Sequence, residues 1–339
     1  MKKFKYMIKR IFSMNYSELF KTASRVSKKT NRNYFVILFD IIYCGFKYMA
    51  GYVDYEVFCF YNLNKEQRAT IITRGINNKF VKLLNGQNFT DIIDDKLTFH
   101  EHYKDYLNRD WLDLRKCSYE DFEKFIKSKK VVMVKPVDLS CGKGVEKITV
   151  DESTNIKELY DSLLENKQIL VEDYIVQHPA ISKIYPNSVN TLRIVSIYRN
   201  GEVHIVFRSI RMGNSGNVVD NFNHGGLLTT IDEDGVIRKP AIDKLGNVYE
   251  KHPYTGTELI NYKIPFFDEA IEYVKKLALH TPQVGYIAWD IAITENGPTV
   301  IEGNAFPGHD LYQSKVHMNP DGTGLLPVFE EVIYGKKTA

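Results

Sequence analysis

The second half of the chain alternates apolar and polar positions at the spacing of β-strands, and turn residues interrupt the alternation. The pattern predicts six strands, at residues 131–135, 145–150, 168–175, 191–198, 203–211 and 226–231. Asn200-Gly201 separates the fourth strand from the fifth and is typical of a tight hairpin turn. Helical spacing predicts helices at residues 153–165 and 267–280. Because most strands meet through hairpins, we expect an α+β fold of antiparallel sheets with packed helices.

The first 128 residues have a mostly helical pattern instead. Ser118 followed by Asp121 predicts a capped helix that runs from Phe122 to Ser128. We therefore divide the chain into three parts. They are a basic and aromatic helical region (1–60), a helical part of the main module (61–128) and the strand-rich module itself (129–335).

Positive charge is concentrated near the N-terminus, where residues 1–33 contain ten Lys or Arg and a single acid, Glu18. An aromatic and apolar stretch follows at residues 34–53. We interpret the two segments as a buried aromatic helix behind a solvated basic helix. The alternative is a pair of interfacial helices that lie against anionic lipid. Asp40 and Lys47 interrupt the apolar stretch, which argues against a membrane span, and no cleavage site for a signal peptide follows.

Over the whole chain the formal net charge is only +3, so the charge gives no argument for a nucleic-acid partner. The four cysteines, Cys44, Cys59, Cys117 and Cys141, show no Cys-x-x-Cys spacing. They indicate reduced thiols in a cytoplasmic protein and not a zinc site or a disulfide framework.

A second predicted hairpin carries the strongest candidate chemistry. Two apolar runs flank the turn residues Asn296-Gly297, with Asp290 in the first run and Glu302 and Asn304 at the end of the second. Residues 302 and 304 share one face of their strand because side chains alternate. If the hairpin register brings Asp290 beside them, three oxygen ligands converge, and such a group suits Mg²⁺. The sequence therefore predicts the metal site of a nucleotide-dependent enzyme.

Lys135 ends an apolar strand, where an ammonium group is costly unless it reaches water at an edge or meets an anion. The following loop contains Gly142, Lys143 and Gly144, whose backbone N–H groups can approach a phosphate closely. Such turns are also common without a ligand, and neither the Rossmann nor the Walker fingerprint is present. In combination with Lys135 and the acidic hairpin, the loop favours phosphate binding.

Other polar residues have both a functional and a structural interpretation. Glu172 can accept hydrogen bonds from an adenine or a ribose, or it can be a solvated strand end. Arg193, in a core strand, and Arg211 suit a phosphate or a carboxylate, whereas a surface salt bridge is the alternative for Arg211 and for Arg208. Arg208 and Arg211 are three residues apart and are expected on opposite faces of their strand unless a bulge intervenes. His224 lies in a Gly-rich connection and can act as a base, although a lone loop histidine usually has no such role.

These motifs, in this order, resemble the ATP-grasp superfamily. The resemblance runs through Lys135-Pro136, the loop 140–144, Val171-Glu172, residues 190–193, and Asp290 with Glu302 and Asn304. More narrowly, residues 60–63, 190–194, 223–226 and 289–290 are similar to the sugar-transfer-associated ATP-grasp branch. The resemblance covers roughly residues 55–325. It implies two α+β lobes that hold a nucleotide between antiparallel sheets, with a helical N-terminal region in addition.

The resemblance also implies a role for each matching residue. The expected ATP-binding residues are Lys135, Ser140, Gly142, Lys143, Gly144, Val145, Glu172, Asp173 and Ile175. Asp290, Glu302 and Asn304 are expected to hold Mg²⁺, for which Mn²⁺ can substitute. Arg193 is expected to stabilise the transferring phosphate and the acyl-phosphate, and Arg211 and His224 complete the expected catalytic group.

The implied activity is ATP-dependent ligation of a carboxylate to an amine through an acyl-phosphate, in the assembly of a bacterial capsule or other surface polysaccharide. The expected partners are small-molecule or sugar-linked carboxylates and amines, and no nucleic acid. The expected location is the cytoplasm, with peripheral contact to anionic membrane or to glycosyltransferases as an additional hypothesis. Two alternatives stay open: a phosphoryl transferase that uses the same site, and a non-catalytic nucleotide-binding partner of a glycosyltransferase. ADP release that requires both a carboxylate and an amine would distinguish the ligase.

Overall fold

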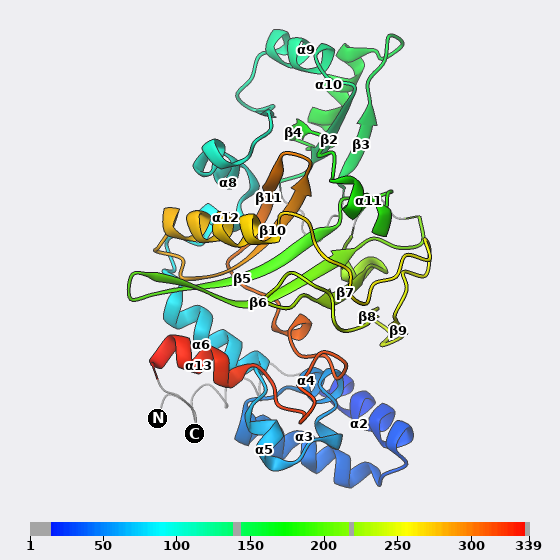
Figure 1. The fold of residues 1–339 in the computed structure, drawn as a ribbon, viewed down its shortest axis with the longest axis vertical. Helices are drawn as coiled ribbons and strands as arrows, with labels where there is room; N and C mark the ends of the chain where they lie inside the picture. The colour runs from blue at the N-terminus through cyan, green and yellow to red at the C-terminus, as the bar shows by residue number, and fades with distance from the viewer. Residues whose placement is uncertain (1–14, 138–143, 217–219, 336–339) are drawn as a thin grey trace. The chain divides into compact units, whose positions relative to one another are not determined.

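The computed structural model describes residues 15–137, 144–216 and 220–335 (Figure 1). The chain forms two compact units. Unit 1 comprises Met1–Leu83 and Gly308–Ala339, and unit 2 comprises Leu84–Pro307. The sequence analysis divided the chain after residues 60 and 128 instead, because no sequence pattern indicates that the C-terminal residues pack with the N-terminal helices.

Unit 1 is helical. Its elements are α2 (Tyr16–Thr30), α3 (Tyr34–Tyr48), α4 (Tyr52–Val57), the 3₁₀ helix η1 (Phe60–Asn62), α5 (Lys65–Ala69), α6 (Arg74–Leu84), the 3₁₀ helix η4 (His309–Leu311) and α13 (Leu326–Tyr334). Asn15 and Asn33 cap α2 and α3 by accepting hydrogen bonds from backbone N–H groups of the first turn. No helix in the described part of the chain combines the length and apolar character that crossing a membrane requires.

The smaller sheet of unit 2 has four antiparallel strands in the order β1-β4-β2-β3. They are β1 (Trp111–Asp113), β2 (Val131–Lys135), β3 (Glu146–Thr149) and β4 (Leu170–Asp173). Helices α9 (Tyr119–Lys127) and α10 (Ile156–Glu165) pack on this sheet through Phe122 and Leu163. The predicted cap of α9 is confirmed, because Oγ of Ser118 accepts a hydrogen bond from the N–H of Asp121. Strand β1 was not predicted, since three residues are too few to show alternation.

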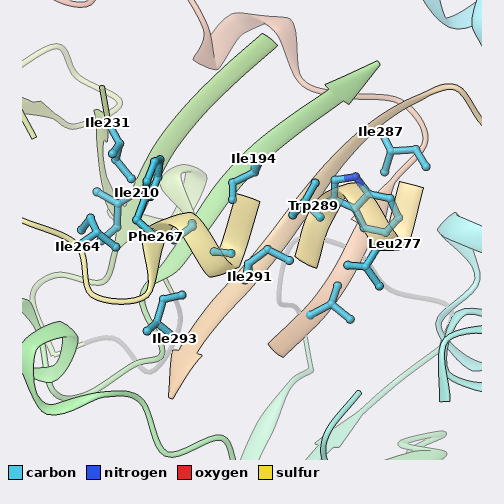
Figure 2. Close-up of a cluster of buried hydrophobic side chains, with 14 of the residues drawn as sticks. Ile194, Ile210, Ile231, Ile264, Phe267, Leu277, Ile287, Trp289, Ile291 and Ile293 are labelled. Carbon is cyan, nitrogen blue, oxygen red and sulfur yellow. The ribbon is translucent and has the colours of Figure 1, made fainter. Parts of the chain in front are cut away.

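The larger sheet has seven antiparallel strands in the order β11-β10-β5-β6-β7-β8-β9. They are β5 (Thr191–Arg199), β6 (Glu202–Met212), β7 (Leu227–Thr230), β8 (Ala241–Ile242), β9 (Val248–Tyr249), β10 (Tyr286–Thr294) and β11 (Gly297–Asn304). Helix α12 (Phe267–His280) packs on this sheet, and Phe267 and Leu277 join Ile194, Ile291 and Trp289 in the core (Figure 2). The sheets and their packed helices confirm the predicted α+β class.

The remaining elements of unit 2 are short. They are α7 (Asp91–Asp94), α8 (Lys96–His102), η2 (Lys104–Tyr106), α11 (Pro179–Ile184) and η3 (Phe222–His224). Both predicted hairpin turns are present. Asn200 and Gly201 have positive φ angles of 53° and 90°, which is the geometry that an Asn-Gly turn favours.

Candidate functional site

Asp290 and Glu302 face each other across the β10–β11 hairpin. Near the turn the ladder pairs Ile291 with Val300, so a regular ladder would next pair Asp290 with Ile301 and turn Glu302 to the other face of the sheet. A β-bulge between Asp290 and Ile291 adds one residue to β11, and Asp290 pairs with Glu302 instead. Asn304 lies two residues further on the same face. The bulge therefore brings together the three residues that the sequence predicted as a group.

Two arginines hold Asp290 from the neighbouring strands. Arg193 on β5 lies directly opposite Asp290, with Nε 2.5 Å from Oδ1 and Nη2 2.9 Å from Oδ2. Arg211 on β6 donates from Nη1 to the same Oδ2 at 2.8 Å. Both guanidinium groups and Asp290 are buried. Charged groups at this depth are stable only as a closed network, so Asp290, Arg193 and Arg211 act as one unit.

A second bulge decides which arginine joins this network. Ile197 pairs with His204, and a regular β5–β6 ladder would pair Arg193 with Arg208. The register shifts by one residue between Val195 and Ser196, so that Arg193 pairs with Ser209. Arg211 then shares the face of Arg193, whereas Arg208 lies on the other face, 3.7 Å from Glu233. Arg208 and Arg211 therefore face opposite sides of β6, as their spacing in the sequence predicted.

Asp220 completes the network and was not singled out in the sequence. Its Oδ1 accepts a hydrogen bond from Nη2 of Arg211 at 3.1 Å, and its Oδ2 accepts one from the backbone N–H of Thr191 at 3.1 Å. Asp220 is buried. Its sequence signal is weak, because a single acid after two valines in a connecting segment has no characteristic spacing.

The two carboxyl groups of the hairpin have opposite pKa shifts. Burial raises the pKa of Asp290, but the positive charges of Arg193 and Arg211 outweigh this effect and leave it below the ordinary value. Burial and the negative charge of Asp290 raise the pKa of Glu302, and the arginines only partly oppose this. A bound cation would favour the ionised form of Glu302, so cation affinity is expected to increase as pH rises.

The donor set of this group fits a hard cation. Among the residues that the structure describes, Nδ2 of Asn304 is buried without a hydrogen-bond partner, whereas Oδ1 of Asp290 is in contact with Nε of Arg193. Glu302 and Asn304 are partly buried. Within that same part of the chain, no three residues of the His, Cys, Asp and Glu types cluster as a metal site. Two carboxylates and one amide are the candidate ligands of the hairpin, and such oxygen donors suit Mg²⁺ or Mn²⁺ with remaining positions for water or phosphate oxygens.

A second buried network surrounds Glu172 on β4. Its carboxylate forms ion pairs with Nζ of Lys135, with Nε of Arg109 at 2.8 Å and with Nε2 of His100 at 2.9 Å. The side chain of Glu172 is 1% exposed. Glu172 is therefore not a solvated strand end, which was the structural interpretation of its sequence position. The sequence did not indicate His100 and Arg109, because they lie 72 and 63 residues before Glu172.

Positive charge exceeds negative charge in the Glu172 network. Burial raises the pKa of Glu172, but Arg109 and Lys135 outweigh it and hold the pKa well below its ordinary value. Burial and the positive charges of Arg109 and Lys135 lower the pKa of His100, although Glu172 opposes this. The ring of His100 lies between the carbonyl oxygen of Lys96, 2.7 Å from Nδ1, and the Glu172 carboxylate, 2.9 Å from Nε2, and Nη2 of Arg109 is 3.5 Å from the same Nε2. One carboxylate thus faces two cations, Arg109 and Lys135, and the excess charge at the end of β2 attracts anions.

Arg109 also connects this network to the acidic hairpin. Its Nη1 donates a hydrogen bond to the backbone carbonyl of Val300 at 2.7 Å, two residues before Glu302 on β11. The pKa of Glu302 is raised overall, but the positive charge of Lys135 is close enough to oppose this rise slightly. The smaller sheet therefore places a cation near the acids of the larger sheet, within one unit of the protein.

Replacing Glu172 by Gln is expected to destabilise unit 2 by about 1–3 kcal/mol at pH 7, because two buried cations lose their carboxylate. Since the pKa of Glu172 is depressed in the folded state, its contribution is complete above the unfolded value of about 4.3 and is lost as pH falls below it. The difference between wild type and Glu172→Gln should therefore narrow on acidification. Urea unfolding followed by tryptophan fluorescence measures it, because both tryptophans, Trp111 and Trp289, lie in unit 2. A difference in unfolding free energy that does not change with pH would contradict the conclusion that Glu172 is an ionised partner of these cations.

The other predicted ATP-binding residues have varied positions. Ser140, Gly142 and Lys143 lie outside the described residues. Gly144 is exposed, and its carbonyl accepts a hydrogen bond from Nε2 of Gln168 at 3.1 Å. Val145 and Ile175 are half-buried beside strands β3 and β4. The carboxylate of Asp173 forms an ion pair with Lys129 at 2.8 Å.

His224 ends the 3₁₀ helix η3, with an exposed side chain. Its backbone N–H donates to the carbonyl of Asn221 at 2.9 Å. The catalytic role predicted for His224 stays a prediction, as do the metal and nucleotide roles of the residues above.

A family profile matches most of the chain. The sequence profile described as sugar-transfer associated ATP-grasp matches residues 75–332. No protein of curated function matches the sequence.

Several solved structures of ligases are similar to this chain. D-alanyl-alanine synthetase A from Vibrio cholerae is 14% identical, with a TM-score of 0.41, over 71% of this chain and 60% of that protein. Phosphoribosylamine–glycine ligase from Thermotoga maritima is 12% identical, with a TM-score of 0.39, over 65% and 49%. L-amino acid ligase from Bacillus licheniformis is 16% identical, with a TM-score of 0.42, over 77% and 53%. The chain thus spans less than two thirds of the length of each of these proteins.

Proposed function

We propose, from the premise that the chain belongs to the sugar-transfer associated ATP-grasp family, that it is an ATP-dependent ligase joining a carboxylate to an amine. The observation that carries the proposal is the pairing of two charge groups of opposite character in unit 2. The charges of Lys135 and Arg109 exceed the charge of Glu172, while Asp290, Glu302 and Asn304 offer oxygen ligands beside Arg193 and Arg211. A nucleotide triphosphate needs both, because its phosphates bind cationic side chains and a divalent metal.

In the proposed reaction, the substrate carboxylate attacks the γ-phosphorus of ATP, and the bond to the β-phosphate oxygen breaks to release ADP. The amine then attacks the acyl carbon of the acyl-phosphate, loses a proton, and displaces inorganic phosphate. Mg²⁺ held by Asp290, Glu302 and Asn304 would neutralise phosphate charge during the transfer.

The protein's own contribution is positioning and electrostatic stabilisation. Lys135 would release Glu172 in part and bind a phosphate, since its ammonium is partly exposed while Glu172 is fully buried. Arg193 holds its guanidinium rigidly against Asp290, so it can meet the charge that develops on the transferring phosphoryl group without rearrangement. Arg211 is tied to both Asp290 and Asp220 and therefore fixes the orientation of Asp290.

The substrates proposed are a sugar-linked or small-molecule carboxylate and an amine, such as an amino acid and an amino sugar, in the assembly of a bacterial surface polysaccharide. The family's association with sugar transfer supports this choice. The proposed location is the cytoplasm, where ATP is available.

A paired substrate screen tests the proposal. Purified full-length protein with Mg·ATP is incubated with sugar acids, amino sugars and amino acids, singly and in pairs, and ADP and phosphate are measured. We expect ADP and phosphate in equal amounts, and only when a carboxylate and an amine are both present. A stable phosphorylated product from one substrate alone would identify a phosphoryl transferase instead, and failure to bind Mg·ATP would favour a non-catalytic partner.

Replacing Lys135 by Ala is expected to weaken ATP binding at least tenfold, because a charged contact to phosphate is lost. Calorimetric titration of the protein with ATP in the presence of Mg²⁺ measures the change. Lys130→Ala is the matched control, since Lys130 immediately precedes the same strand but is exposed. Equal ATP affinities of the two variants would show that Lys135 does not contribute to nucleotide binding.

A further inference from the structure

Helix α3 in unit 1 presents a continuous apolar face to solvent. One side of the helix packs in the core of the unit, through Ile37, Ile41, Cys44 and Tyr48. The other side carries Phe35, Val36, Phe39, Ile42, Tyr43 and Phe46, all exposed. Phe35 and Phe39 have 63% and 67% of their side chains in water. A row of exposed aromatic residues at helical spacing is unusual for a surface helix and indicates a contact surface.

The charges next to this apolar face are positive. Lys28 and Lys29 are exposed at the end of α2, and Arg32 is exposed in the short connection that leads into α3. Lys47 lies at the other end of the helix, with its Nζ 5.4 Å from the ring centroids of Tyr43 and Tyr48. Basic residues therefore occur at both ends of the apolar face.

The single acid of α3 does not compensate this charge. Asp40 is held by two hydrogen bonds from Arg68, at 2.8 Å and 2.7 Å, and by the hydroxyl of Tyr55 at 2.7 Å. Its carboxylate is therefore already neutralised from inside unit 1. The exposed face combines aromatic side chains with positive charge and has no acid of its own to oppose it.

The charge pattern argues against a second copy of the chain as the occupant. In a two-fold symmetric pair of α3 helices, an antiparallel arrangement would bring Lys47 of one copy towards Lys28 and Lys29 of the other. A parallel arrangement would place each lysine beside its own equivalent. Both arrangements desolvate like charges without a matching acid, which is unfavourable.

We propose that the exposed face of α3, with the basic residues Lys28, Lys29 and Lys47, docks on the surface of an anionic lipid bilayer. Aromatic rings insert readily at the boundary between head groups and acyl chains, and lysines at the helix ends meet anionic head groups. Because one side of α3 is part of the protein core, only its exposed side can contact lipid. The helix would therefore lie in the plane of the interface, along a length of about 22 Å. The sequence interpretation of a buried aromatic helix describes only the side that faces the core.

Vesicle sedimentation with the full-length protein tests the proposal. We expect the wild type to sediment with vesicles of 70% phosphatidylcholine and 30% phosphatidylserine, and at least tenfold less with pure phosphatidylcholine. The triple variant Phe35→Ser, Phe39→Ser and Phe46→Ser should bind the anionic vesicles at least tenfold more weakly, because three apolar insertions are lost. The double variant Lys28→Glu and Lys29→Glu should lose the preference for anionic vesicles.

A matched control replaces exposed apolar residues outside α3. Val176→Ser with Leu245→Ser removes two exposed apolar side chains of unit 2 and should bind vesicles as the wild type does. Circular dichroism of each variant confirms that the fold is retained. Equal sedimentation of the wild type and the triple phenylalanine variant would overturn the proposal. A wild-type dimer in gel filtration that the same variant converts to a monomer would assign the face to a contact between copies instead.

Discussion

Glu302→Gln is expected to lower ATP-dependent turnover by at least about 10²–10³-fold, since a metal ligand contributes several kcal/mol of charge stabilisation in the transition state. Gln has the shape of Glu but brings no negative charge to the oxygen group that Asp290 and Asn304 complete. Phosphate release under conditions that saturate the wild type measures the loss. Manganese titration of both proteins, without substrate, measures the metal affinity separately.

The same substitution is expected to leave stability unchanged or slightly higher at pH 7. The pKa of Glu302 is raised by burial and by the charge of Asp290, so the folded state disfavours its ionised form. A neutral Gln removes this repulsion, and lost activity with retained stability is typical of a residue kept for function. Glu295→Gln, in the exposed turn of the same hairpin, is the control and should turn over as the wild type does. If Glu302→Gln were as active as this control, the metal assignment would be wrong.

The sequence predicted the composition of this site better than its geometry. The alternation of β11 places Glu302 and Asn304 on one face, and the Asn-Gly turn defines the hairpin, so both features follow from local rules. Whether Asp290 shares that face depends on a single added residue in the ladder. A bulge depends on the pairing of two strands and has no clear signature in either sequence. The same reason explains why strand alternation alone does not show whether Arg208 or Arg211 shares the face of Arg193, whereas the family resemblance implied Arg211.

The network around Glu172 was predictable only in part. Lys135 stands out in the sequence because burial of a lone charge in an apolar strand is costly, and Glu172 stands out as an acid at the end of an apolar strand. Their mutual ion pair depends on the antiparallel neighbours β2 and β4, and His100 and Arg109 come from a helix and a loop far earlier in the chain. Long-range contacts of this kind arise from the tertiary fold, and no spacing pattern in a single sequence predicts them.

Both networks share one physical feature: a buried carboxylate is oriented by cations from other segments of the chain, and its stability depends on them. Asp290 has Arg193 and Arg211, and Glu172 has Lys135 and Arg109. Such networks contribute little net stability in comparison with an apolar core, but removal of one member leaves an unpaired charge. Their value to the protein lies in rigid placement of charge, which a phosphoryl-transfer site requires.

Arg211→Met is therefore expected to destabilise unit 2 by about 3–5 kcal/mol, the usual cost of removing one partner from a buried ion pair. Met retains much of the volume and the apolar stem of Arg, so the loss of stability measures mainly the effect of removing the charge. Asp290 and Asp220 both lose a cation at hydrogen-bond distance, and Asp220 already has a raised pKa because of its burial. Urea unfolding followed by tryptophan fluorescence, with Trp289 beside Asp290 on β10, measures the change.

Arg208→Met separates this effect from a general loss of positive charge on β6. Arg208 lies on the opposite face of the strand and forms only a 3.7 Å contact to the exposed Glu233, so its loss should cost less than about 1 kcal/mol. The two variants should also differ with pH. Without Arg211 the pKa values of Asp290 and Asp220 rise in the folded state, so their charged forms penalise folding at neutral pH and the penalty falls as the acids become protonated. The free energy of unfolding of Arg211→Met should thus approach that of the wild type on acidification. For Arg208→Met, the difference from the wild type should stay the same at each pH. Equal and pH-independent losses in both variants would show that Asp290 and Asp220 do not depend on Arg211.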